Sequence, residues 1–180
     1  MAETWGKTRR GRLVRADPNT KVDALAARPV LRDAVRSRHE LARAFKSGPT
    51  ATNRLRRVAV ITLLRAVGHA LDSVDGRRSP FMKQAVKAAW ARWRENPIHN
   101  LIFHEFIKKE RDVVLKEYRF TTGRLLVGEP PVEAAEQIGP ATMLLIGDHL
   151  YSALEAVDAA LAWWEAELTR IEDEARNARA

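Results

Sequence analysis

Cysteine is absent from all 180 residues of the chain. This absence excludes disulfide bonds and thiolate chemistry, and it fits a reducing compartment. Long apolar runs are absent as well, because the longest one, residues 58–64, is far too short to cross a bilayer. Residues 1–13 carry basic side chains and no apolar segment of the kind that a secretory signal needs. We therefore expect a cytoplasmic protein with no membrane partner.

Common catalytic and cofactor-binding motifs are also missing. The sequence contains no G-x-x-x-x-G-K-[ST] phosphate loop, no G-x-G-x-x-G turn and no G-x-S-x-G nucleophile turn. The zinc-binding H-E-x-x-H motif is absent too, since His104-Glu105 is not followed by a second histidine at the required spacing. We therefore expect neither a metal ion nor an organic cofactor.

Charge is plentiful but unevenly distributed. Residues 1–57 contain 15 Lys/Arg against 5 Asp/Glu, whereas residues 120–180 contain 4 against 11. Such asymmetry indicates an anionic partner for the basic side, nucleic acid being the obvious class. The alternative is that the acidic C-terminal helix packs against the basic part and neutralises it. The sequence leaves both interpretations open.

Turn signals divide the chain into an arm and one helical domain. Residues 1–19 have no helical period and form a basic N-terminal arm, while residues 20–180 form a single helical domain. Capping residues, glycines and prolines predict four helices. They cover residues 20–45 (interrupted at Pro29), residues 52–74, a stretch that begins with Ser79-Pro80 and ends before Pro97, and a stretch from Asn96-Pro97 to about Tyr118. Residues 119–147 are least regular, and the apolar stretches 124–127 and 143–146 predict either a small hairpin or a long structured loop.

The last predicted helix starts around Asp148. Its apolar residues alternate spacings of four and three, at Leu150, Leu154, Val157, Leu161, Trp164, Leu168 and Ile171. The predicted fold is therefore all-α, a bundle of about five helices with a basic arm and an irregular or small-hairpin insertion before the last helix. The seam over residues 150–171 could also serve as an interface for a homodimer or a partner protein.

Basic side chains concentrate in the arm and at the start of the second predicted helix. Arginines at this density neutralise phosphates without reading sequence. The predicted nucleic-acid-binding residues are Arg9, Arg10, Arg12, Arg15, Arg54, Arg56 and Arg57. Trp5 is available in the arm to stack on a base or to anchor packing.

Two polar groups on helices are candidates for catalysis. Arg65, His69 and Asp72 share one helix face, where a histidine beside a carboxylate acts as a general base in many sites. Glu110 lies between apolar residues one turn to either side, so it needs a basic partner from another helix, such as Arg65 or His69. Arg111 follows it, and the alternative to a polar pocket here is a structural buried ion pair.

Residues 105–118, EFIKKERDVVLKEY, resemble one helix of the HEPN superfamily. These all-helical proteins are common in phage-defence and toxin–antitoxin systems, and many are dimeric, metal-independent ribonucleases. The resemblance implies that Arg111 is the family's catalytic arginine and that Asp112 stands where asparagine is frequent. Lys116 occupies the position at which the family has a histidine, which is a departure from its pattern.

These observations leave three functions. The preferred one is a nucleic-acid-binding helical module without catalysis, which binds RNA or DNA through the basic arm. The second is a HEPN-like ribonuclease of a phage-defence or toxin system, with Arg65, His69, Glu110 and Arg111 as its polar site. The third is an assembly subunit that uses the helix seam.

Overall fold

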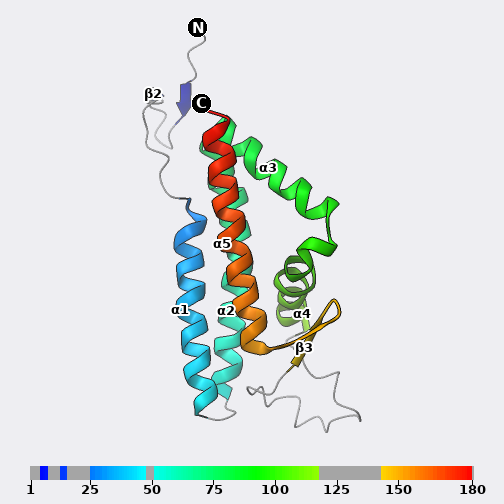
Figure 1. The fold of residues 1–180 in the computed structure, drawn as a ribbon. Coiled ribbons are helices and arrows are strands. Elements are labelled where there is room, and N and C mark those ends of the chain that lie inside the picture. Colours follow the sequence, from blue (N-terminus) through cyan, green and yellow to red (C-terminus); the bar gives the residue numbers. More distant parts are fainter. Residues whose placement is uncertain (1–4, 8–12, 16–24, 48–50, 118–142, 180) are drawn as a thin grey trace.

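The computed structural model describes residues 5–7, 13–15, 25–47, 51–117 and 143–179, and it confirms the all-α class. The long helices α1, α2 and α5 run side by side, and α3 leads away from them toward α4 (Figure 1). The helices are α1 (Ala27–Lys46), α2 (Ala51–Ser73), α3 (Pro80–Glu95), α4 (Lys109–Glu117) and α5 (Ala153–Asn177). Two short hairpins accompany them, β1 (Trp5–Lys7) with β2 (Leu13–Arg15) and β3 (Met143–Ile146) with β4 (His149–Ser152).

Helix α1 starts later than predicted, and Pro29 does not interrupt it. The proline lies within the first turn, where its missing N–H has no intrahelical acceptor to lose. The backbone N–H groups of Ala26 and Ala27 donate instead to the Asp75 carboxylate, at 2.7 and 3.0 Å. Asp75 is fully buried in η1 (Asp75–Arg77), the short 3₁₀ turn between α2 and α3. A residue far along the chain thus caps α1.

Helix α3 starts at the predicted Ser79-Pro80 signal and ends before Pro97, as predicted. The Ser79 hydroxyl accepts a hydrogen bond from the Met82 N–H at 3.1 Å, and Pro80 occupies the first helical position. Its last residue is Glu95, and Asn96 is the C-cap ahead of Pro97. The fourth predicted helix is not continuous, because the chain forms a 3₁₀ turn η2 (Ile98–Asn100), a π-helix η3 (Ile102–Lys108) and then α4.

Helix α5 starts five residues after the predicted position. Ser152 and Glu155 form a capping box in which each side chain accepts from the other residue's backbone N–H. The residues before it form β4, which pairs with β3 across Gly147, whose φ of +58° suits a tight turn. The predicted insertion therefore includes a hairpin. In this hairpin residues 143–146 pair with residues 149–152, which the sequence predicts as the start of the last helix. Residues 124–127 lie outside the described part of the chain.

The predicted seam of α5 faces the protein's own core. Val157, Trp164, Leu168 and Ile171 are at most 1% exposed, whereas Leu150 lies on β4 and is 56% exposed. Alanines complete the buried face of the helix, at Ala153, Ala156, Ala160 and Ala175. These side chains pack within one hydrophobic cluster that α1, α2, α3 and η3 also supply. These buried residues of the seam are accordingly not available on the surface to contact a second protein.

Within the described residues, no helix combines the length and apolar character that a membrane span requires.

Candidate functional site

The start of α2 contains a buried ion pair. Arg57 Nη2 lies 3.0 Å from Glu110 Oε1, and each side chain is 2% exposed. Burial lowers the pKa of Arg57 to about 10, while the neighbouring Glu110 carboxylate limits the drop. Arg57 therefore stays charged at neutral pH. Glu110 has the predicted basic partner from another helix, but this partner is Arg57 and neither Arg65 nor His69.

This pairing removes Arg57 from the predicted nucleic-acid surface, because a fully buried guanidinium cannot reach a phosphate. Arg56 is partly engaged as well, since its guanidinium donates to the Glu40 carbonyl oxygen at 3.3 Å. Arg54 is partly buried. Of the predicted arm residues, Arg9, Arg10 and Arg12 lie outside the described residues, and only the backbone of Arg15 is described, in β2.

Arg65 and His69 line a small hollow of about 250 Å³, together with Gly68, Asp72 and Trp90. The glycine is explained by packing, because a Cβ at position 68 would lie 3.0 Å from the Trp164 ring. Glu110 and Arg111 are not among the residues described as lining this hollow. Arg65 follows Arg57 by eight residues, which corresponds to about 12 Å along the helix axis. The four predicted catalytic residues are thus divided between two places.

Arg111 is on α4 and forms an ion pair with its neighbour Asp112, at 2.7 Å. Both side chains are 38% exposed. The arginine and the acidic residue that the HEPN resemblance singles out are therefore at the surface, next to the buried Glu110. His69, the histidine proposed to act with them, instead lines the small hollow beside Arg65.

A larger hollow of about 990 Å³ lies between the end of α2, η1 and α3. It adjoins the small hollow, because Asp72 and Trp90 line both. We call the two together the basic groove. Its ionisable residues are one aspartate, one histidine and six cationic side chains. They are Asp72, His69, Arg65, Arg77, Arg78, Lys83, Lys87 and Arg94.

Among the described residues, several cations of the groove lie together without carboxylate partners. In the described part of the chain, Arg77, Lys83 and Lys87 form no ion pair, and Arg94 donates to the Trp90 carbonyl oxygen at 3.2 Å. Arg78 does have a partner, the buried Asp75, at 3.2 Å. Positive charge without matching carboxylates creates a potential that attracts anions.

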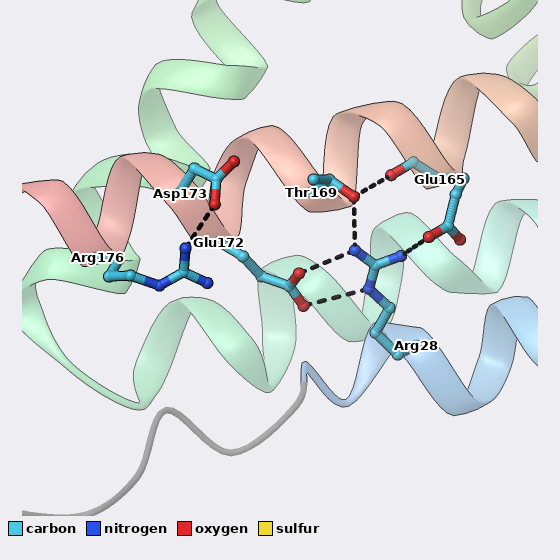
Figure 2. A network of polar contacts seen from close by, with 6 residues as sticks. All are labelled: Arg28, Glu165, Thr169, Glu172, Asp173 and Arg176. Carbon is cyan, nitrogen blue, oxygen red and sulfur yellow. Dashed lines mark hydrogen bonds and ion pairs between the residues drawn. The ribbon is translucent and has the colours of Figure 1, made fainter.

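Elsewhere the acidic α5 neutralises basic residues. Arg28 of α1 binds Glu165, Thr169 and Glu172 of α5 (Figure 2). Arg38 forms a two-point contact with Asp158, at 2.7 and 2.5 Å. Arg92 of α3 pairs with Glu167 and Glu174, at 3.0 and 2.9 Å. The sequence's charge asymmetry is thus largely cancelled where α5 packs, whereas several neighbouring cations of the basic groove keep their charge uncompensated within the described residues.

Sequence reasoning singled out Arg65, His69 and Asp72 but missed the rest of the groove. Its residues come from two helices and a turn, so no local run of basic residues marks them. One signal was present: Lys83, Lys87, Trp90 and Arg94 follow one another at spacings of four, three and four. These spacings place the four side chains on one face of α3.

The groove offers cations and hydrogen-bond donors, which suit an anion, but few metal ligands. In the described ranges, no group of three or more histidine, aspartate or glutamate side chains is arranged to hold a metal ion. The chain matches no protein-family model, and comparisons with curated proteins and with solved structures gave no match.

Proposed function

We propose that the protein binds nucleic acid without catalysis and that the basic groove is its principal contact surface. One observation carries this proposal: the groove gathers basic side chains from α2, η1 and α3, and three of them form no ion pair within the described residues. Lysine and arginine side chains that are not neutralised internally are available to replace the counterions of a phosphate backbone. The basic arm supplies further positive charge, and we propose that Arg9, Arg10, Arg12 and Arg15 contact the same nucleic acid.

The groove favours a polymer over a small anion because its cations are spread out. Lys83 and Arg94 lie eleven residues apart on α3, which corresponds to about 16 Å. Arg77 at the end of η1 and Arg78 directly after it add further charge to the groove. Several separated phosphates bind such an arrangement better than one compact anion does, since each phosphate releases its own counterions.

The experiment measures the binding of fluorescently labelled RNA and DNA by the full-length chain at several salt concentrations. The test variant carries Lys83→Glu and Lys87→Glu, both at exposed positions of α3. We expect at least tenfold weaker binding and a salt-dependence slope that is lower by about two. A variant in which the four arm arginines become glutamine tests the contribution of the arm.

The matched control carries Lys46→Glu and Lys108→Glu, which change the net charge equally at exposed lysines outside the groove. Equal loss in both variants would mean that net charge alone determines binding, and it would refute the groove as the contact surface. Examining the same mixtures for RNA cleavage addresses the HEPN-like alternative. Cleavage that disappears in Arg111→Ala would replace the proposed function with a ribonuclease.

A further inference from the structure

We propose that the basic groove selects single-stranded nucleic acid and that an unpaired base packs against Trp90. This inference rests on the proposed function and goes beyond it by naming the strand form and the residue that recognises it. Three observations support it: the concave shape of the groove, the spacing of the residues along α3, and the way in which the Trp90 ring is held.

The shape of the groove disfavours a double helix. A duplex carries its phosphates on a convex outer surface, and proteins usually read it with elements that project into its grooves. Here the cations surround a hollow of about 990 Å³ between α2, η1 and α3. A narrow strand with unpaired bases fits into such a hollow, whereas a duplex would contact only its rim.

The residues along α3 match a strand that follows the helix. Lys83, Lys87 and Arg94 lie on one face, and Trp90 lies between the second and third of them. The stripe measures about 16 Å, which corresponds to about five nucleotides at the rise of a stacked strand, about 3.4 Å each. Proteins that bind single strands commonly combine basic side chains with an aromatic ring, because the ring stacks on a base of any identity.

The Trp90 ring is partly buried, and its neighbours fix its orientation. It packs edge-on against Trp93 at a centroid distance of 4.8 Å and against Phe103 at 5.7 Å. The same residue lines both hollows of the groove. A ring that is already held in place loses little conformational freedom when a base packs on it, so the contact contributes most of its stacking energy.

The first experiment compares a twelve-nucleotide single strand with the duplex of the same sequence, using the full-length chain. We expect the single strand to bind about tenfold more tightly. Among shorter oligomers, affinity should rise up to about five nucleotides and then level off when the arm arginines are neutralised. Ultraviolet crosslinking followed by mass spectrometry should place the crosslink at Trp90 in the unmodified protein.

The second experiment uses Trp90→Leu, with Trp163→Leu as its control. Trp163 is also partly buried in the aromatic cluster, where it contacts Trp93 and Phe103, but it does not line the groove. We expect Trp90→Leu to weaken single-strand binding by about tenfold, as the loss of one base–aromatic stack does, and Trp163→Leu to leave it unchanged. Thermal unfolding of both variants confirms that they are folded.

The outcomes separate the two proposals. Equal affinity for strand and duplex, with crosslinks elsewhere and no effect of Trp90→Leu, overturns this inference. The proposed function survives that result if the Lys83→Glu and Lys87→Glu variant still loses binding. Absence of salt-sensitive binding to any nucleic acid overturns both.

Discussion

Single buried polar residues connect distant parts of this chain. The Arg57–Glu110 pair joins α2 to α4, and the two residues are 53 positions apart. Replacing a buried pair as a whole is often harmless, but removing one member leaves an uncompensated charge in the interior. The pair is therefore a sensitive point of the fold, whichever function the surface serves.

Glu110→Gln should lower the free energy of unfolding by about 3 kcal/mol, because Arg57 would remain buried without that carboxylate. Chemical denaturation measures the difference. The control is Glu105→Gln, which breaks the exposed pair with Lys109 and should change stability by less than about 1 kcal/mol. Similar values for both variants would show that burial of the first pair has little energetic effect.

Asp75→Ala should lower the free energy of unfolding by about 2 kcal/mol, since two backbone N–H groups at the start of α1 lose their acceptor. Hydrogen exchange should speed up at Ala26 and Ala27 in particular. Asp72→Ala is the control, because Asp72 is exposed near the end of α2, three residues before Asp75. Unchanged exchange at the start of α1 in Asp75→Ala would contradict the cap.

At the scale of elements, charged contacts at the rim of the shared core connect α5 to α1. Arg28 donates to Glu165, Thr169 and Glu172, and its side chain is 16% exposed (Figure 2). The hydrogen bonds that Arg28 donates to the Glu172 carboxylate raise the pKa of Arg28, so this guanidinium stays charged at any pH of interest. Its planar fork suits several acceptors at once, which a lysine ammonium does not reproduce.

Arg28→Lys should therefore lose about 1 kcal/mol of stability. The control is Arg176→Lys, whose pair with Asp173 lies within one helix and is exposed (Figure 2). We expect no measurable change there. Thermal unfolding at low and high salt tests both, and equal shifts would indicate that the three-partner contact has no special role.

Helix starts show what the sequence can predict and what it cannot. Ser79-Pro80 and the proline after α3 act within a few residues, and their predictions were confirmed. The Ser152–Glu155 capping box is equally local, but the apolar spacing of Leu150 continued the helical period and concealed it. The true start of α1 depends on Asp75, which is far away in sequence. Most of the groove and the identity of the Glu110 partner were missed for the same reason, because they depend on how the helices meet.

At the scale of the whole molecule, α1, α2, α3, η3 and α5 share one hydrophobic cluster. Four tryptophans and Phe103 gather within it, with centroid distances from 4.8 to 6.2 Å. Their near-ultraviolet circular dichroism reports on tertiary packing, whereas the far-ultraviolet signal reports on all helices. The predicted single helical domain over residues 20–180 has a direct test in these two signals.

We expect both signals to change in one coincident transition upon denaturation, because no helix of the cluster has a core of its own. The Trp163→Leu variant should shift both transitions together. Separate midpoints for the two signals would divide the chain into independent units and contradict the single domain.

The cap on α1 also has a consequence for the order in which the protein is made. The first turn of α1 leaves the ribosome early, but Asp75, which accepts two of its N–H groups, is synthesised 48 residues later than Ala27. Chains emerge N-terminus first, so α1 must wait for α2 and the turn after it before its own beginning is complete. The start of α1 is thus synthesised first in the helical domain but gains its cap only after Asp75 has been synthesised.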